Sequence, residues 1–143
     1  MDMSMFTIII STAYLDAIGL TIIRIGIGIL FIGHGYLKIK GGVEEWKWTG
    51  EQMSNLGITF APVFWGVCAM LAEFVGGICL TTGFATRIAA SFMAFVMLVA
   101  IVYHIKKGDS YGYISFPLSQ LIIFIGLIIA GSGTLSVDYY WFF

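Results

Sequence analysis

Charged residues are scarce in this chain of 143 residues. They make up 10% of the sequence, whereas hydrophobic residues make up 59%. A water-soluble domain carries roughly 25% charged residues, so this composition leaves too little polar surface for one. The net charge of −1 excludes a basic surface for nucleic acid, and the 16% aromatic content is unlike that of a disordered chain. The sequence therefore predicts an integral membrane protein whose outer surface contacts lipid.

Cysteine is equally rare, with Cys68 and Cys79 as its two occurrences. They lie 11 residues apart in one apolar segment, about 16 Å along a helix, which is too far for a disulfide bond. No CxxC pair and no HxxxH or HExxH spacing occurs. We therefore predict neither a disulfide framework nor a metal site.

Four apolar runs are each long enough to cross about 30 Å of hydrocarbon as a helix. They cover residues 18–37, 60–82, 86–104 and 114–132. The loop after Thr82 is so short that the second and third runs must be antiparallel neighbours, with Gly83 ending the earlier helix. Ser115 and Pro117 are expected to form the cap and first turn of the fourth helix. The prediction is a single all-α domain, an antiparallel bundle of four transmembrane helices.

The one sizeable polar segment, Lys38 to Thr59, separates the first two runs. It mixes lysines and glutamates with two tryptophans, which favours a short interfacial helix on the membrane surface. Five lysines lie in this loop and in the loop between the third and fourth runs, whereas the opposite side holds only Arg87. The positive-inside rule therefore predicts that both of these loops are cytoplasmic and both termini are outside.

Two charged residues fall inside the apolar runs. Arg24 lies 13 residues before Leu37, and Glu73 lies 13 residues after Phe60, so both are expected about 20 Å from the same membrane face. We therefore predict a buried polar pair, which either locks two helices together or lines a functional cavity. Small residues at helical spacing around Glu73, including Gly76 and Gly77, predict close approach of another helix.

Two histidines and a glutamine are predicted to share one layer near the lysine-rich face. His34 lies three residues before the end of the first run, His104 ends the third, and Gln120 lies six residues into the fourth. Each could simply bond lipid headgroups at the interface. Haem ligation by the two histidines is disfavoured, since they would have to face each other across a cavity. A pocket for a quinone headgroup or another small amphiphile fits these residues better.

These residues lie in motifs that resemble those of the DoxX family of small four-helix bacterial membrane proteins. The first runs from Arg24 to Lys38 and contains His34 and Gly35. The second comprises Glu73-Phe-Val-Gly76-Gly77-Ile-Cys-Leu80, Gly83, Thr86 and Arg87, the third is His104, and the fourth runs from Gly131 to Asp138. The family often carries a glutamate near the start of the last span, where this chain has Ser115-Phe-Pro117-Leu-Ser119-Gln120.

The resemblance implies a multi-pass protein of the bacterial inner membrane that works with oxidoreductases linked to the quinone pool. It also implies that Arg24, His34, Lys38, Glu73, Arg87, His104 and Asp138 are the positions to examine. We therefore expect a membrane subunit of a redox system that binds a quinone and has a partner oxidoreductase or a second copy of itself. No nucleophile–base pair or cofactor motif occurs, so electrons would have to come from the partner.

Two other classes of function stay open at this point. A non-enzymatic assembly or chaperone subunit would offer Arg24 and Glu73 to partner helices, and its small-residue stripe would face outward. A small proton-linked transporter usually shows inverted repeats, and no convincing repeat relates the two halves of this sequence.

Overall fold

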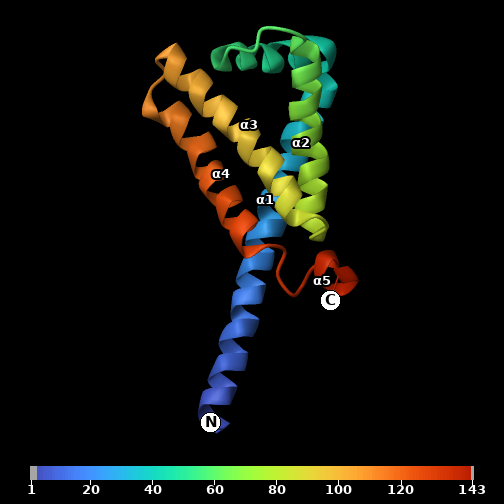
Figure 1. Ribbon diagram of the computed structural model, residues 1–143, viewed down its shortest axis with the longest axis vertical. Helices are drawn as coiled ribbons and strands as arrows, with labels where there is room; N and C mark the ends of the chain where they lie inside the picture. The colour runs from blue at the N-terminus through green and yellow to red at the C-terminus, as the bar shows by residue number, and fades with distance from the viewer. Residues whose placement is uncertain (1–2, 143) are drawn as a thin grey trace.

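Four long helices run up and down between two ends of the molecule (Figure 1). The computed structural model describes residues 3–142, with side chains for residues 12–141. Within this part of the chain there is no strand, and four helices are long and apolar enough to cross a membrane. The predicted all-α fold is thereby confirmed. The elements are α1 (Met3–Glu51), the 3-10 helix η1 (Gln52–Leu56), α2 (Pro62–Thr82), α3 (Thr86–Lys107), α4 (Tyr111–Ala130) and α5 (Val137–Phe142).

Left-handed glycines end both α2 and α3, the first of them as predicted. Gly83 has a φ of 74°, and its N–H donates to the carbonyl oxygen of Cys79 at the end of α2. Gly108 has a φ of 76° and closes α3 in the same way. Because glycine enters this left-handed region without a steric penalty, both turns are tight, and they hold α2, α3 and α4 as antiparallel neighbours.

The predicted start of the fourth helix is wrong. We expected Ser115 and Pro117 in its cap and first turn, but α4 begins at Tyr111 and encloses Pro117. The Ser115 hydroxyl donates to the carbonyl oxygen of Gly112 at 3.0 Å instead of capping the helix. A membrane helix tolerates an interior proline because side-chain hydroxyls and local adjustments satisfy freed backbone groups.

The first helix continues a few residues past its expected end at Leu37. The backbone of Gly42 is not helical, with a φ of 64° and a ψ of −152°, so α1 consists of two helical pieces that meet at a kink there, and the second piece ends at Glu51. Beyond this kink the chain crosses the end of the bundle toward α3, as the predicted short interfacial helix between the first two spans requires (Figure 1). At the other end, the N-terminal part of α1 projects beyond the remaining helices (Figure 1).

Glycines on the facing sides of α1 and α2 let the two backbones touch. A Cβ atom on Gly35 would lie 2.5 Å from Cβ of Phe74, and one on Gly77 would lie 2.7 Å from the carbonyl oxygen of Gly28. Nearer to η1, a Cβ on Gly66 would lie 1.7 Å from the carbonyl oxygen of Trp46. No side chain larger than hydrogen fits at such distances. These contacts set the register of α1 against α2 along most of the length of α2.

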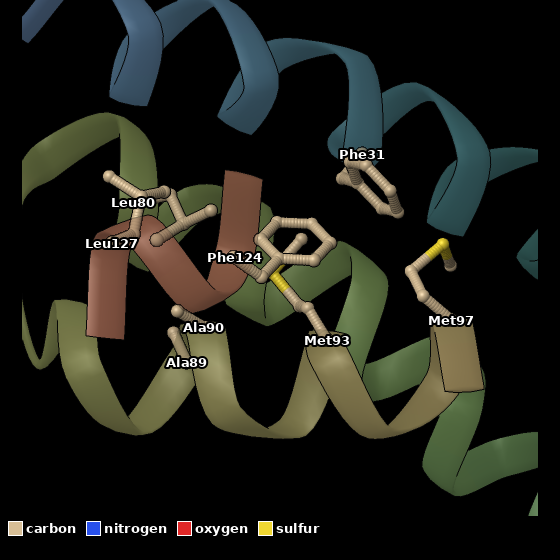
Figure 2. Packing of buried hydrophobic residues seen from close by; sticks show 8 residues of the cluster. All are labelled: Phe31, Leu80, Ala89, Ala90, Met93, Met97, Phe124 and Leu127. Carbon is tan, nitrogen blue, oxygen red and sulfur yellow. The ribbon is translucent and has the colours of Figure 1, made fainter. Parts of the chain in front are cut away.

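All four long helices contribute to one apolar core (Figure 2). The rings of Phe31 on α1 and Phe124 on α4 meet edge to face with centroids 5.1 Å apart. Figure 2 shows the side chains of Met93 and Met97 extending from α3 toward α1. The remaining core residues are Leu80, Ala89, Ala90 and Leu127. This core lies between Arg24 and the end of the bundle that carries η1.

The glycine contacts predict that adding one methyl group changes the stability of the protein differently at two nearby positions of α1. Gly35→Ala should destabilise the protein by about 1–3 kcal/mol, because the new Cβ overlaps Phe74. Gly33→Ala, two residues away, should be neutral or slightly stabilising, because nothing lies within 4 Å of its Cβ position. Thermal unfolding in mild detergent measures both. Equal melting temperatures for the two variants would contradict the packing.

The predicted orientation can be tested at the ends of α3 and α4. In a variant without native cysteines, Ser110→Cys should resist a membrane-impermeant maleimide added to spheroplasts, because the loop with Lys106 and Lys107 is predicted to be cytoplasmic. Thr134→Cys, an exposed position at the opposite end, should be labelled. The reverse pattern would invert the orientation.

Candidate functional site

An ion pair between the half-buried Lys38 and the buried Glu73 joins α1 to α2 near the middle of α2. The Nζ atom of Lys38 lies 2.5 Å from Oε2 of Glu73, and only 3% of Glu73 is exposed. Glu73 is 11 residues from Pro62 and nine from Thr82, so each end of α2 is about 14–16 Å away. A charge at this depth is costly unless it is paired, and Lys38 provides the opposite charge.

Arg24 is buried as predicted, but it does not pair with Glu73. Its guanidinium donates to the carbonyl oxygens of Leu80 at 2.7 Å and Thr81 at 3.3 Å on α2, and to that of Leu135 at 2.8 Å. These carbonyls lie at the end of α2 and in the segment before α5. Arg24 therefore satisfies free carbonyl groups at the end of a helix, one of the roles that cations play there.

The register of α1 explains why the predicted Arg24–Glu73 pair fails. The prediction took Leu37 as the end of a helix, level with the start of α2. Because α1 continues to Glu51, residues further along α1 face α2, and Gly35 lies beside Phe74. Arg24 then lies level with Leu80, seven residues or about 10 Å beyond Glu73.

Two further family-motif residues make contacts at the start of α3, one from the C-terminal segment and one to the end of α4. The carboxylate of Asp138 accepts hydrogen bonds from the backbone N–H groups of Ala85 at 2.7 Å and Thr86 at 3.1 Å. It thereby caps α3, whose own N-cap residue is an alanine without a capping oxygen. Arg87, which is exposed, donates to the carbonyl oxygen of Ile129 at 3.3 Å. We interpret both residues as structural.

A cavity of about 360 Å³ lies between α1, α2 and α3, next to the ion pair. It falls in the size range of small-molecule sites, which are mostly apolar with a few polar groups. Lys38, Glu73 and His104 belong to its wall, so the structure brings these three predicted residues together. The other wall residues are Trp48, Thr49, Gln52, Met53, Trp65, Cys68, Ala69, Ala72, Phe92, Phe95, Val96, Met97, Val99, Ala100 and Tyr103.

Two wall residues carry buried polar atoms without a hydrogen-bond partner. These atoms are Oγ1 of Thr49, a residue that is 9% exposed, and the indole Nε1 of Trp65. Aromatic rings frame the same end of the cavity, where Trp48 meets Tyr103 edge to face at 6.3 Å. Unsatisfied polar groups are costly in an apolar interior, so this wall is suited to a ligand that forms hydrogen bonds.

The remaining predicted residues lie away from the cavity. His34 is exposed, and its ring is 5.9 Å from that of Phe116 on α4. Gln120 is buried on α4, with its Oε1 unpartnered, but it does not line the cavity. Gly35 and Gly77 serve the contact between α1 and α2, and Gly76 faces Met93 on α3. The described residues contain no group of three histidine, cysteine or acidic side chains that could hold a metal ion.

Sequence reasoning missed Thr49, Trp65 and Asp109. The first two are ordinary residues in their segments, and only the tertiary fold makes them part of a wall. Asp109 accepts a hydrogen bond from Nδ1 of His104 at 2.7 Å. A signal for that contact was present in the sequence, since a glycine directly before an acidic residue at a helix end turns the chain back on itself.

The chain is similar to known membrane proteins over most of its length. The family model described as DoxX matches residues 19–105. The chain is 33% identical over 127 residues to the "Inner membrane protein YqjF" of Escherichia coli K12, which covers 87% of this chain and 92% of that protein. It is 29% identical over 121 residues to the "Putative oxidoreductase CatD" of Bacillus subtilis 168, covering 85% of each. No solved structure matches the chain.

The ion pair predicts which double substitutions will couple. Lys38→Met should lower the free energy of unfolding by about 3–5 kcal/mol, because it leaves the Glu73 carboxylate buried and unpaired. Adding Glu73→Gln should recover part of that loss. Arg24→Met combined with Glu73→Gln should be additive within about 0.5 kcal/mol, because these two residues contact different groups. Unfolding titrations in mixed detergent micelles measure both cycles. The assignment of the Lys38–Glu73 ion pair would be refuted if Arg24 and Glu73 coupled while Lys38 and Glu73 did not.

Proposed function

This chain belongs to the DoxX family and is a multi-pass protein of the inner membrane, and on that basis we propose that it is a quinone-binding subunit of a redox system. The quinone headgroup occupies the cavity between α1, α2 and α3. The chain works with a partner oxidoreductase, which supplies the electrons.

One observation carries this proposal, namely a largely apolar cavity next to a buried ion pair at the middle of a membrane span. Ionisable residues at such a depth mark functional sites by default. The Lys38–Glu73 pair adds no net charge to the cavity, so a neutral ligand suits it better than an ionised one. A quinone ring is apolar and neutral, and membrane quinones reach such a cavity from the lipid.

The unpartnered polar atoms support a ligand with hydrogen-bond acceptors. The indole N–H of Trp65 is a donor only, and the hydroxyl of Thr49 can donate as well. Quinone carbonyl oxygens accept hydrogen bonds from such donors. Hydrogen bonds from the two side chains would orient the ring beside Glu73. Since buried donors without partners are penalised, a bound acceptor would also stabilise the protein.

The chain's own contribution to the chemistry is to bind the headgroup and to move protons. Reduction of a quinone to a quinol takes two electrons and two protons. Glu73 and His104 are the wall residues that carry exchangeable protons, and Lys38 holds the Glu73 carboxylate in place through the ion pair. Electron transfer is assigned to the partner. The name of the Bacillus subtilis relative is in keeping with a redox role.

The assembly-subunit alternative has less support. That hypothesis required the small residues of the second span to face outward, toward partner helices. Gly66 and Gly77 are instead buried against α1, and Gly76 is buried against α3. These residues are therefore already used for packing within the chain, and Glu73 is turned toward the cavity and Lys38.

Filling the cavity should abolish binding without unfolding the protein. Ala100→Leu adds bulk to the α3 side of the wall and should weaken binding of ubiquinone-1 by tenfold or more, which corresponds to about 1.4 kcal/mol. Gly126→Leu adds similar bulk on α4, where the surroundings are open, and should bind like the unmodified protein. Quenching of tryptophan fluorescence by added ubiquinone-1 in detergent measures both. Equal affinity in the two variants, or none in the unmodified protein, would refute the proposal.

A further inference from the structure

An aspartate–histidine pair lies at the end of the cavity that η1 covers. His104 is in the last turn of α3, and its Nδ1 lies 2.7 Å from Oδ2 of Asp109. Left-handed Gly108 turns the chain, and the backbone N–H of Asp109 donates to the carbonyl oxygen of His104 at 3.0 Å. The turn therefore brings the carboxylate back onto the histidine of the helix that it ends.

Two tyrosine rings flank the ring of His104. It stacks on Tyr113 of α4 at a centroid distance of 6.1 Å and an angle of 23°, and it meets the Tyr103 ring edge to face at 5.1 Å. Lys107 is the cation beside the pair, with its Nζ 3.6 Å from Oδ2 of Asp109. The charged groups that share the cavity wall with His104 are Lys38 on α1 and Glu73 on α2.

We infer that Asp109 is a positioning residue that holds the Nδ1–H tautomer of His104, so that Nε2 exchanges a proton with the ligand in the cavity. This inference rests on the proposed function, because it takes the ligand to be a quinone. A carboxylate can only accept hydrogen bonds, so Nδ1 must be the donor. The second nitrogen then remains available, and His104 already belongs to the cavity wall.

The charge state of Asp109 suits this role. Its hydrogen bond from His104 and its proximity to Lys107 hold the pKa of the carboxyl group below its usual value. The group is therefore ionised at neutral pH, and as a carboxylate it accepts the hydrogen bond from Nδ1. The stabilisation that this carboxylate contributes to the folded state is lost only in acid, as the pH falls through its lowered pKa. Asp109 thus links the loop between α3 and α4 to a wall of the cavity.

The first test of the inference needs no ligand and replaces Asp109 by asparagine. The amide is neutral and can donate to Nδ1 as well as accept from it, so Asp109→Asn should lower the share of the Nδ1–H tautomer that the acceptor-only carboxylate enforces. Nitrogen NMR of protein labelled in histidine distinguishes the two tautomers, and a His34→Gln background leaves His104 as the single signal. Asp16→Asn, at an exposed position on the projecting part of α1, serves as the control and should leave the tautomer unchanged.

Binding of ubiquinone-1 then tests the proton exchange. When the pH is lowered from about 8 to about 5, affinity should rise several-fold in the Asp16→Asn control, because a protonated Nε2 can donate to a quinone carbonyl. The rise should be reduced or absent in Asp109→Asn. An unchanged tautomer, or the same pH profile in both variants, would overturn the inference alone. A control that binds no ubiquinone-1 at any pH would overturn the proposed function, and the inference with it.

Discussion

Close contact between the backbones of α1 and α2 is the constraint on which the rest of the structure depends. Glycines at facing positions, among them Gly28, Gly35, Gly66 and Gly77, allow an approach that any side chain would prevent. In a membrane, such van der Waals contact drives helix association, because lipid leaves little hydrophobic force between helices. The resulting register places Lys38 beside Glu73 and Arg24 beside the carbonyl groups at the end of α2.

The buried charges therefore serve two different purposes at two levels of the bundle. Arg24 joins α1 to the end of α2 and to the segment before α5, while Asp138 caps α3 from that same segment. These contacts give the family-motif residues at that end of the bundle a structural role. The Lys38–Glu73 pair lies deeper, beside a cavity that has further unpartnered polar atoms in its wall. That difference is why we assign ligand binding to the second cluster only.

Composition and helix periodicity were sufficient to predict the fold, because four apolar runs with glycine-terminated ends permit few arrangements. The pairing of Arg24 with Glu73 was not predictable in the same way. It depended on where α1 ends, and the polar residues after Lys38 concealed a helix that continues through a bend at Gly42. Lys38 consequently lies near the middle of α2 rather than at the membrane surface. Thr49 and Trp65 line the cavity through tertiary contacts that no local pattern encodes.

Photolabelling with an azido-substituted short-chain ubiquinone, followed by mass spectrometry of the purified protein, tests the central claim most directly. The account predicts that the label is found on the cavity wall, in residues 48–53, 65–73 and 92–104, and that an excess of unlabelled quinone suppresses it. The outward-facing residues of α4, such as Ile122 and Ile129, should stay unlabelled. A label spread over the lipid-facing surfaces, or one that excess quinone does not displace, would contradict a quinone site in the cavity.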